Sequence, residues 1–196
     1  ELITDLTEEL PEIVADMNSG CNLMQDLTHS LRKFVTQEET PEQGTKPYPI
    51  INYAMSLCRS AAIKTRGVIT YRGAQDLPPV KIGSTELTQI LFNLINNAAQ
   101  ALDREAAERG IVTINTQVQE SIIEFSIADT GVGMSPEMVS SFGKPFLSTK
   151  TEGTGLGATQ CRRLVGKAGG ELSIDSTLGI GTTIRFSLPR AGRPQD

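Results

Sequence analysis

The spacing of apolar residues changes near residue 48 and divides the chain into two parts. In residues 1–39 the apolar positions alternate spacings of three and four, with Gly20 as the exception: Ile3, Leu6, Leu10, Ile13, Met17, Met24, Leu27, Leu31 and Phe34. This heptad pattern predicts a helix of a coiled coil or bundle. Pro11 confines the regular helix to Glu12–Glu38, since proline fits a first turn and breaks a helix interior. A helix of ~40 Å with one apolar stripe cannot bury that stripe alone, so we expect a dimerising hairpin or coiled coil rather than packing on its own domain.

A proline-rich linker, residues 41–47, leads into a region of mixed helical and alternating patterns, residues 48–190, with a short tail at 191–196. The pattern predicts helices at 50–65, 85–108, after 135–136 and at 155–168, and strands at 67–72, 80–82, 110–119, 121–128, 171–176 and 181–188. Tight turns join neighbouring strands. We therefore expect an α/β (α+β) two-layer sandwich, with a mixed, mostly antiparallel sheet and helices on one face, over a doubly wound parallel sheet.

Composition narrows the cellular context. No apolar run approaches the ~18–20 residues of a membrane span, the first residues lack a signal peptide's basic region, and the absence of an initial Met indicates a fragment. Three widely separated cysteines favour neither a zinc site nor a disulfide framework. A net charge of −5 without a basic tract argues against nucleic-acid binding. We expect a cytoplasmic domain that makes no membrane contact itself, although the full-length protein could be membrane-anchored.

The helix predicted at 85–108 carries a polar stripe beside its broad apolar arc. Asn93, Asn97 and Gln100 stack at spacings of four and three. Asparagine is a mediocre helix former, and amide oxygens are neutral ligands suited to Mg²⁺ that shares substrate phosphates. The pattern is equally typical of a solvated polar face, and this helix alone does not decide between the two.

The stretch IADTGVGMSPEM ends a predicted strand at Asp129. Gly131 and Gly133 allow close approach of the backbone to a flat ligand, and Asp129 offers an acceptor for an exocyclic amine. Ser135 with the following proline reads as a helix N-cap. A strand, turn and helix without any ligand is the simpler alternative for a single motif of this kind.

The stretch KPFLSTKTEGTGLGATQ, residues 144–160, matches two other phosphate-binding motifs only in part. Gly153, Gly155 and Ala158 fit a dinucleotide fingerprint, but the preceding residues are too polar for the buried strand that this fingerprint requires. No P-loop fits either. What remains is a glycine-rich loop running into a helix, whose first amide groups and dipole favour phosphate. Ser148, Thr149, Lys150 and Thr154 could add donors and a charge to such a mobile lid.

Together, NLINNA, DTGVG, PFLSTK, GTGLG and the late GIGT resemble the N, G1, F and G2 boxes and final glycine turn of sensor histidine kinases. The resemblance spans about residues 48–189, with the motifs in order, and its wording is most similar to nitrogen- and dicarboxylate-sensing members. It implies the ATP-binding α/β sandwich shared with type II topoisomerases, Hsp90-type chaperones and MutL-type repair proteins.

The resemblance also implies roles for individual residues. Asn97 would ligate Mg²⁺, with Asn93 close to metal and phosphate, and Asp129 would bind the adenine amine. The other implied ATP-binding residues are Gln100, Gly131, Gly133, Ser148, Thr149, Lys150, Gly153, Thr154, Gly155, Leu156, Gly157 and Thr182. The implied catalytic residues are Asn93, Asn97 and Lys150. Ala158 departs from the family, where a bulkier Leu is usual.

The implied reaction is transfer of the γ-phosphoryl group of Mg·ATP to a histidine, for relay to a response-regulator receiver domain. Residues 1–40 resemble the second helix of the family's dimerisation hairpin, which implies a homodimer. The family's phosphoacceptor histidine lies on the first helix, and His29 does not match its context, so the acceptor is expected elsewhere. A nucleotide-sensing pseudokinase, or a serine kinase of the anti-sigma type, remains an alternative.

Overall fold

The computed structural model describes residues 44–103, 108–142 and 156–192. The chain divides into two units, Glu1–Glu38 and Glu39–Asp196, and every described residue belongs to the second. The expected helix 12–38 and His29 lie outside the described residues. Among the helices that are described, none is long and apolar enough to cross a membrane.

The described residues form five strands and four helices. In chain order these are α2 (Pro47–Lys64), β1 (Val68–Tyr71), α3 (Ser84–Ala101), β2 (Ile111–Val118), β3 (Ile122–Asp129), α4 (Pro136–Ser141), α5 (Leu156–Lys167), β4 (Leu172–Thr177) and β5 (Gly181–Pro189). Within the described ranges, each of these helices and strands overlaps a predicted one, whereas the predicted short strand at 80–82 is not formed there. The predicted cap of α4 is confirmed, because the Ser135 hydroxyl accepts a hydrogen bond from the Met138 amide.

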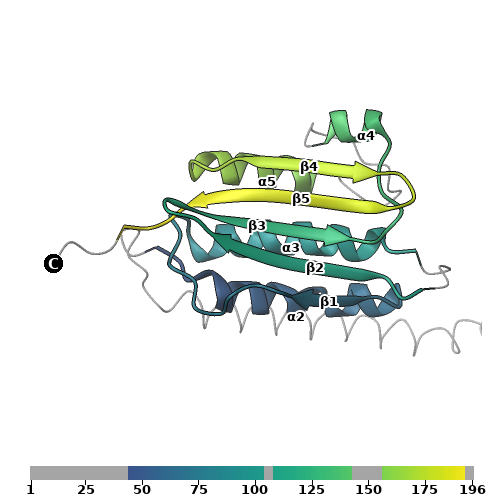
Figure 1. The fold of residues 1–196 in the computed structure, drawn as a ribbon, viewed down its shortest axis with the longest axis horizontal. Helices are drawn as coiled ribbons and strands as arrows, with labels where there is room; N and C mark the ends of the chain where they lie inside the picture. The colour runs from purple at the N-terminus through teal and green to yellow at the C-terminus, as the bar shows by residue number, and fades with distance from the viewer. Residues whose placement is uncertain (1–43, 104–107, 143–155, 193–196) are drawn as a thin grey trace, which may run out of the picture. The chain divides into compact units, whose positions relative to one another are not determined.

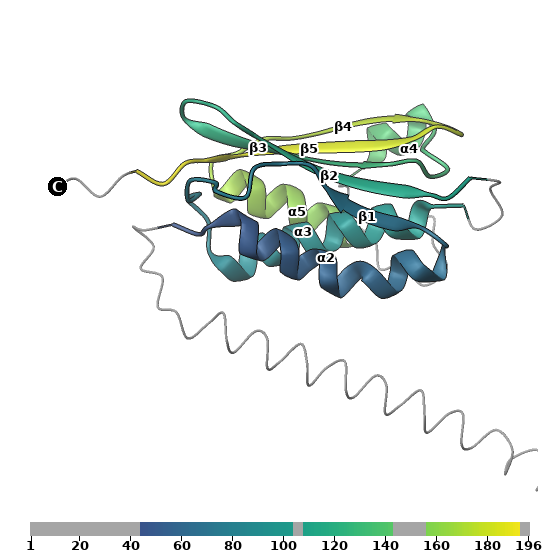
Figure 2. The same ribbon diagram turned by 60° about the horizontal axis from the view of Figure 1, so that its bottom comes forward.

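The strands form one mixed sheet in the order β1-β2-β3-β5-β4. Only β1 and β2 are parallel, and the other three neighbouring pairs are antiparallel. Helices α2, α3 and α5 lie together on one face of the sheet, with α3 between the other two, as the two views show (Figures 1 and 2). This arrangement is the mixed two-layer sandwich that the sequence predicts.

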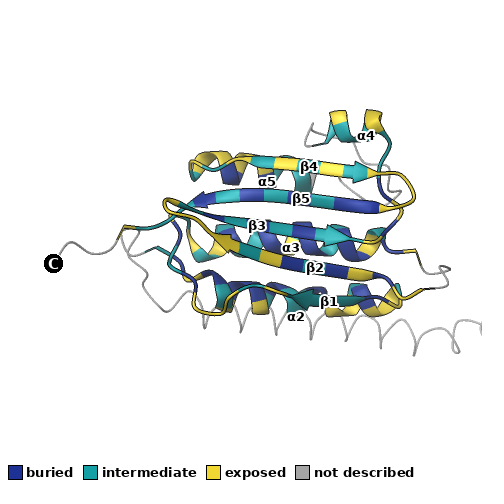
Figure 3. Cartoon of the chain, in the orientation of Figure 1, coloured by how far each residue is buried: buried dark blue, intermediate teal, exposed yellow. Residues whose placement is uncertain are grey.

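The core lies between the sheet and these three helices. Alternate residues of β3 and β5 are buried (Figure 3), as expected for a sheet with one covered face. Phe125 and Phe186 face each other across these two strands with stacked rings, 4.7 Å between centroids. From α3, the buried residues are Leu87, Ile90, Leu91, Leu94, Ile95, Ala98 and Ala99, which is the apolar arc of the sequence.

Helix α3 is shorter than predicted, ending at Ala101 rather than near residue 108. Leu102 is extended, with φ −65° and ψ 135°, and only 4% of it is exposed. Its side chain packs so closely on Gly67 and Gly110 that neither position has room for a Cβ without a shift. The helix therefore ends because Leu102 packs against Gly67 and Gly110 next to the sheet. Helical periodicity gives no sign of such a tertiary contact.

The first and last described residues of this domain are fixed to the same loop. Thr45 exchanges backbone hydrogen bonds with Val80, and Val80 also bridges to Arg190. These isolated bridges replace the predicted strand at 80–82.

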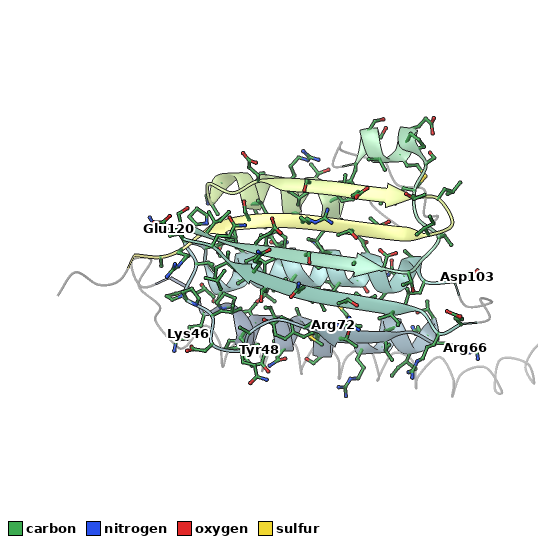
Figure 4. All side chains as sticks on the ribbon, in the orientation of Figure 1. Lys46, Tyr48, Arg66, Arg72, Asp103 and Glu120 are labelled. Carbon is green, nitrogen blue, oxygen red and sulfur yellow. The ribbon has the colours of Figure 1, made fainter. Side chains whose placement is uncertain are left out.

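Helix α2 then starts at Pro47, earlier than the predicted residue 50, because proline is well suited to a first helical turn. Lys46 and Tyr48 lie at the opposite end of the sheet from Asp103 (Figure 4).

Candidate functional site

Asp129 is the last residue of β3, and it continues the row of side chains that point toward the helices. Its Oδ1 accepts hydrogen bonds from the backbone amides of Gly131, at 2.9 Å, and Thr182, at 3.3 Å. No described residue donates to its Oδ2. Burial raises the pKa of this carboxyl, and the two backbone hydrogen bonds oppose the rise. The group is therefore a half-buried, fixed carboxylate with one free acceptor oxygen.

The glycines around Asp129 are required by close approach of one backbone to another. A Cβ on Gly131 would overlap the carbonyl of Ala101, the last residue of α3. Gly133 has φ +65°, and a Cβ there would overlap the carbonyl of Thr177. The Val132 amide donates to the same Ala101 carbonyl at 3.0 Å. The DTGVG loop is thus packed between the end of α3 and the β4–β5 turn, which places Asp129 at the end of α3.

Thr182 lies directly opposite Asp129 in the pairing of β3 with β5, and only 6% of it is exposed. Its hydroxyl is 2.8 Å from the Ser176 hydroxyl, which also bonds the Gly181 carbonyl and accepts from the Met134 amide. The two hydroxyls and Asp129 form one polar group at the end of three strands. Asp129 and Thr182, far apart in the sequence, are therefore in direct contact.

The polar stripe of the sequence lies on α3 as predicted. Asn93 and Asn97 are half-buried, and Gln100 is exposed near the end of the helix. The Asn97 amide forms no hydrogen bond with any described residue. Because Asn93, Asn97 and Ala101 are spaced by four, they follow one line along the helix. That line leads over about 12 Å, at 1.5 Å per residue, toward the loop that holds Asp129.

The other end of this line meets the start of α5, which begins at Leu156. A Cβ on Gly157 would lie 3.6 Å from the Cγ of Asn93. The first turn of α5 is therefore beside Asn93. The free backbone amides and the dipole of a helix start favour phosphate, so the Asn93 amide lies next to a helix end of the kind that favours anions.

Six of the predicted site residues lie outside the described residues: Ser148, Thr149, Lys150, Gly153, Thr154 and Gly155. Their assignments stay predictions. Within the described ranges no cluster of three or more His, Cys, Asp or Glu side chains could hold a metal ion. Among the described residues, amide oxygens are the groups that could hold a divalent cation here together with oxygens of a ligand.

Sequence reasoning missed two side chains of this site. The Ser176 hydroxyl bonds the Thr182 hydroxyl, and Cys161 on α5 lies beside the Asn93 side chain. Ser176 carried a signal, because it is polar at an inward position that follows Leu172 and Ile174 in an alternating strand. The contact of Cys161 with Asn93 depends on how two helices pack, and a single sequence gives no sign of it.

Comparison with known proteins fits this geometry. Residues 82–192 match the family described as histidine kinase-, DNA gyrase B- and HSP90-like ATPases. The sensor histidine kinase ZraS of Klebsiella oxytoca is 30% identical over 189 residues, which is 96% of this chain and 40% of ZraS. The catalytic domain of the histidine kinase ThkA has a TM-score of 0.65 at 24% identity, covering 74% of this chain and 93% of that domain. Full-length ShkA, in complex with AMPPNP, has a TM-score of 0.66 at 26% identity, covering 78% of this chain and 32% of ShkA.

The chain therefore belongs to the family of histidine kinase-, DNA gyrase B- and HSP90-like ATPases. Within that family it contains the ATP-binding catalytic domain of a sensor histidine kinase. It spans less than half the length of the relative ZraS.

Proposed function

We propose that this domain binds Mg·ATP along α3 and transfers its γ-phosphoryl group to a histidine on a dimerisation helix. The observation that carries the proposal is the line from Asp129 to the start of α5. A carboxylate with a free oxygen lies at one end of α3, and a phosphate-favouring helix start lies beside Asn93 at the other. An adenine nucleotide has the same order of groups, an amine-bearing base at one end and phosphates at the other.

The adenine end is recognised through Asp129. Its Oδ1 is held by two backbone amides, so the carboxylate cannot turn away, and Oδ2 is left to accept from the exocyclic amine. The group needs its charge for a strong hydrogen bond, since charge-assisted bonds are roughly twice as strong as neutral ones. Thr182 lies opposite Asp129 and would line the same end of the nucleotide site. Gly131 and Gly133 hold this loop against α3 and the β4–β5 turn.

The phosphate end fits Mg²⁺. Asn97 supplies a half-buried amide that has no partner among the described residues, and amide oxygens are ligands that Mg²⁺ accepts beside substrate phosphates and water. We assign Asn97 as the protein ligand, with Asn93 and Gln100 on the same stripe. When bound, the cation would neutralise developing charge on the phosphates.

The remaining phosphate contacts are proposed for the segment before α5. Lys150, Ser148, Thr149 and Thr154 would approach the phosphates, and Gly153, Gly155 and Gly157 would let this segment close over them. Leu156 begins the helix whose first amides face the same charge. Phosphoryl transfer needs mainly positioning and charge stabilisation, so the lysine, the cation and the helix start are the groups that would accelerate it.

The acceptor and the partners extend the proposal beyond the described residues. Residues 1–40 would pair with a second copy to form a cytoplasmic homodimer, and the acceptor histidine would come from a helix outside this chain. The phosphoryl group would then pass to a response-regulator receiver domain. All of the sensor kinase relatives that support this proposal are longer than the present chain.

The test supplies the full chain with a peptide or fusion carrying a family dimerisation helix and γ-³²P-labelled ATP. We expect an acid-labile, base-stable label on that helix, with none from the Asn97→Ala variant. Nucleotide that binds without any labelling would support a pseudokinase, and an acid-stable label on a serine would support the serine-kinase class. Asn97→Ala should also remove the Mg²⁺-dependent part of ATP affinity in calorimetric titrations. If that part is unchanged, the metal assignment is wrong.

A further inference from the structure

Helices α3 and α5 touch at an unusual set of groups where α5 begins. A Cβ on Gly157 would lie 3.6, 3.7 and 3.8 Å from the Cγ, Oδ1 and Nδ2 atoms of Asn93. The whole amide group therefore lies under the first turn of α5, at van der Waals distance from the one position of this turn that carries no side chain.

Cys161 follows Gly157 by one helical turn and faces the same side of α5. It is fully buried, and its Sγ donates to the carbonyl oxygen of Ile90 at 3.8 Å. The Asn93 side chain lies close enough to this thiol to lower its pKa, against the larger opposite effect of burial. Burial raises the pKa of Cys161 to about 11, so at neutral pH the sulfur keeps the proton that it donates.

We infer that Asn93 and Cys161 are positioning residues that fix the start of α5 against α3, so that the phosphate chain can reach both the helix start and Asn97. We call Asn93, Gly157 and Cys161 the interhelical latch. This inference rests on the proposed function, because it concerns how the phosphate end of that site is built. It gives Asn93 a role distinct from that of Asn97, which is one turn further along α3 and has no described partner.

The latch differs from a direct contact of Asn93 with phosphate in one measurable way. If Asn93 acts only by touching phosphate, removing the Cys161 thiol should not matter. If Asn93 acts by holding α5, removing the thiol should weaken phosphate binding in the same manner as removing the amide, although the thiol is buried and cannot reach a ligand.

The chain offers a matched control for the thiol. Cys58 on α2 is also fully buried, and its Sγ donates at 3.7 Å to the carbonyl of Phe92, from the other neighbour of α3. Cys58→Ala therefore removes a similar thiol and leaves a similar space, but it does not touch the latch. Any loss of Mg·ATP affinity that Cys58→Ala and Cys161→Ala share reports a general loosening of the packing around α3.

The experiment measures the affinities of adenosine, ADP and Mg·ATP for the full chain and its variants by calorimetry, with circular dichroism to check folding. For Cys161→Ala we expect Mg·ATP affinity to fall about 3- to 10-fold, the size of one net neutral hydrogen bond. Adenosine affinity should change by less than about two-fold. A change of that size is no larger than the usual error when the effects of separate sites are added. Cys161→Ser should restore most of the loss, because a hydroxyl can donate in the same place. The double variant with Asn93→Ala should be no weaker than Asn93→Ala alone.

Three results would overturn the latch. The first is a folded Cys161→Ala variant whose ratio of Mg·ATP to adenosine affinity equals that of the wild type. The second is an equal fall in that ratio for Cys58→Ala. The third is additive loss in the double variant. A wild-type chain that binds neither adenosine nor Mg·ATP would instead reject the proposed function, and the latch with it.

Discussion

Replacement of Asp129 by asparagine should weaken adenine binding and leave the fold at least as stable as before. The amide Oδ1 can still accept from the Gly131 and Thr182 amides, so the loop keeps its hydrogen bonds. The new amide nitrogen takes the place of Oδ2, the oxygen that has no donor among the described residues. Two donors, the adenine amine and the side-chain amide, then face each other.

The binding loss follows from the hydrogen bond that disappears. A hydrogen bond to a charged group contributes about 1.5–3 kcal/mol, so the dissociation constant of adenosine should rise about 10- to 150-fold. The free energy of unfolding should instead stay the same or rise. Burial raises the pKa of Asp129, so the folded state binds a proton more tightly than the unfolded state. The ionised carboxyl therefore costs stability at neutral pH, and asparagine removes that cost.

Adenosine titration and urea unfolding at pH 7.5 measure the two effects separately. Asp175→Asn is the control, because Asp175 lies on β4 at an exposed position that points away from the helices. It should change neither quantity much. Asp129→Asn that binds adenosine like the wild type would refute the assignment of the base end. A large loss of stability in Asp129→Asn would show that the carboxylate holds the fold rather than the ligand.

Further predictions concern the pH dependence of binding, two glycines and the core. Adenosine affinity of the wild type should fall as pH drops through the raised pKa of Asp129, while Asp129→Asn shows a flat profile; a flat wild-type profile would count against it. Gly179→Ala should cost about 1–2 kcal/mol, because its φ of +77° is left-handed but its surroundings are open. Gly133→Ala should cost clearly more in urea unfolding, since a Cβ there also overlaps the Thr177 carbonyl, and equal costs would contradict this. Phe125→Ala should lose about 3–5 kcal/mol because the ring is buried and stacked, and a loss below 1 kcal/mol would show that the core is not packed as described.

Periodicity and turn signals were enough to predict the mixed sheet and the helices that cover it, although not the ends of every element. Alternation in β3 and β5 and the apolar arc of α3 each report which side of an element is buried, and this information is local. The end of α3 was wrong because Leu102 is buried by Gly67 and Gly110, residues that come from other elements. The predicted strand at 80–82 failed for a related reason, since Val80 pairs with both Thr45 and Arg190 only as isolated bridges.

The candidate site was predictable to the extent that its groups carry a chemical motif. Asp129, Asn97 and the glycines belong to such motifs, and the structure brings Asp129 and Thr182 into contact. The spacing of Gly131 and Gly133 in the sequence did not reveal which groups lie beside them. In the structure these groups are backbone carbonyl oxygens of the protein. The Asn93 contact with Cys161 depends on helix packing, and a sequence shows neither the distance nor the angle between two helices.

The shared anchoring of the two ends of the domain has a consequence for how it can be joined to other parts. Thr45 and Arg190 both pair with Val80. Arg190 follows the end of β5 that pairs with Ile122, whereas Asp129 lies at the opposite end of β3. Chain that enters before Gly44 and chain that leaves after Ala191 therefore depart from neighbouring points. Both chain connections of the domain therefore lie at the end of the sheet opposite Asp129.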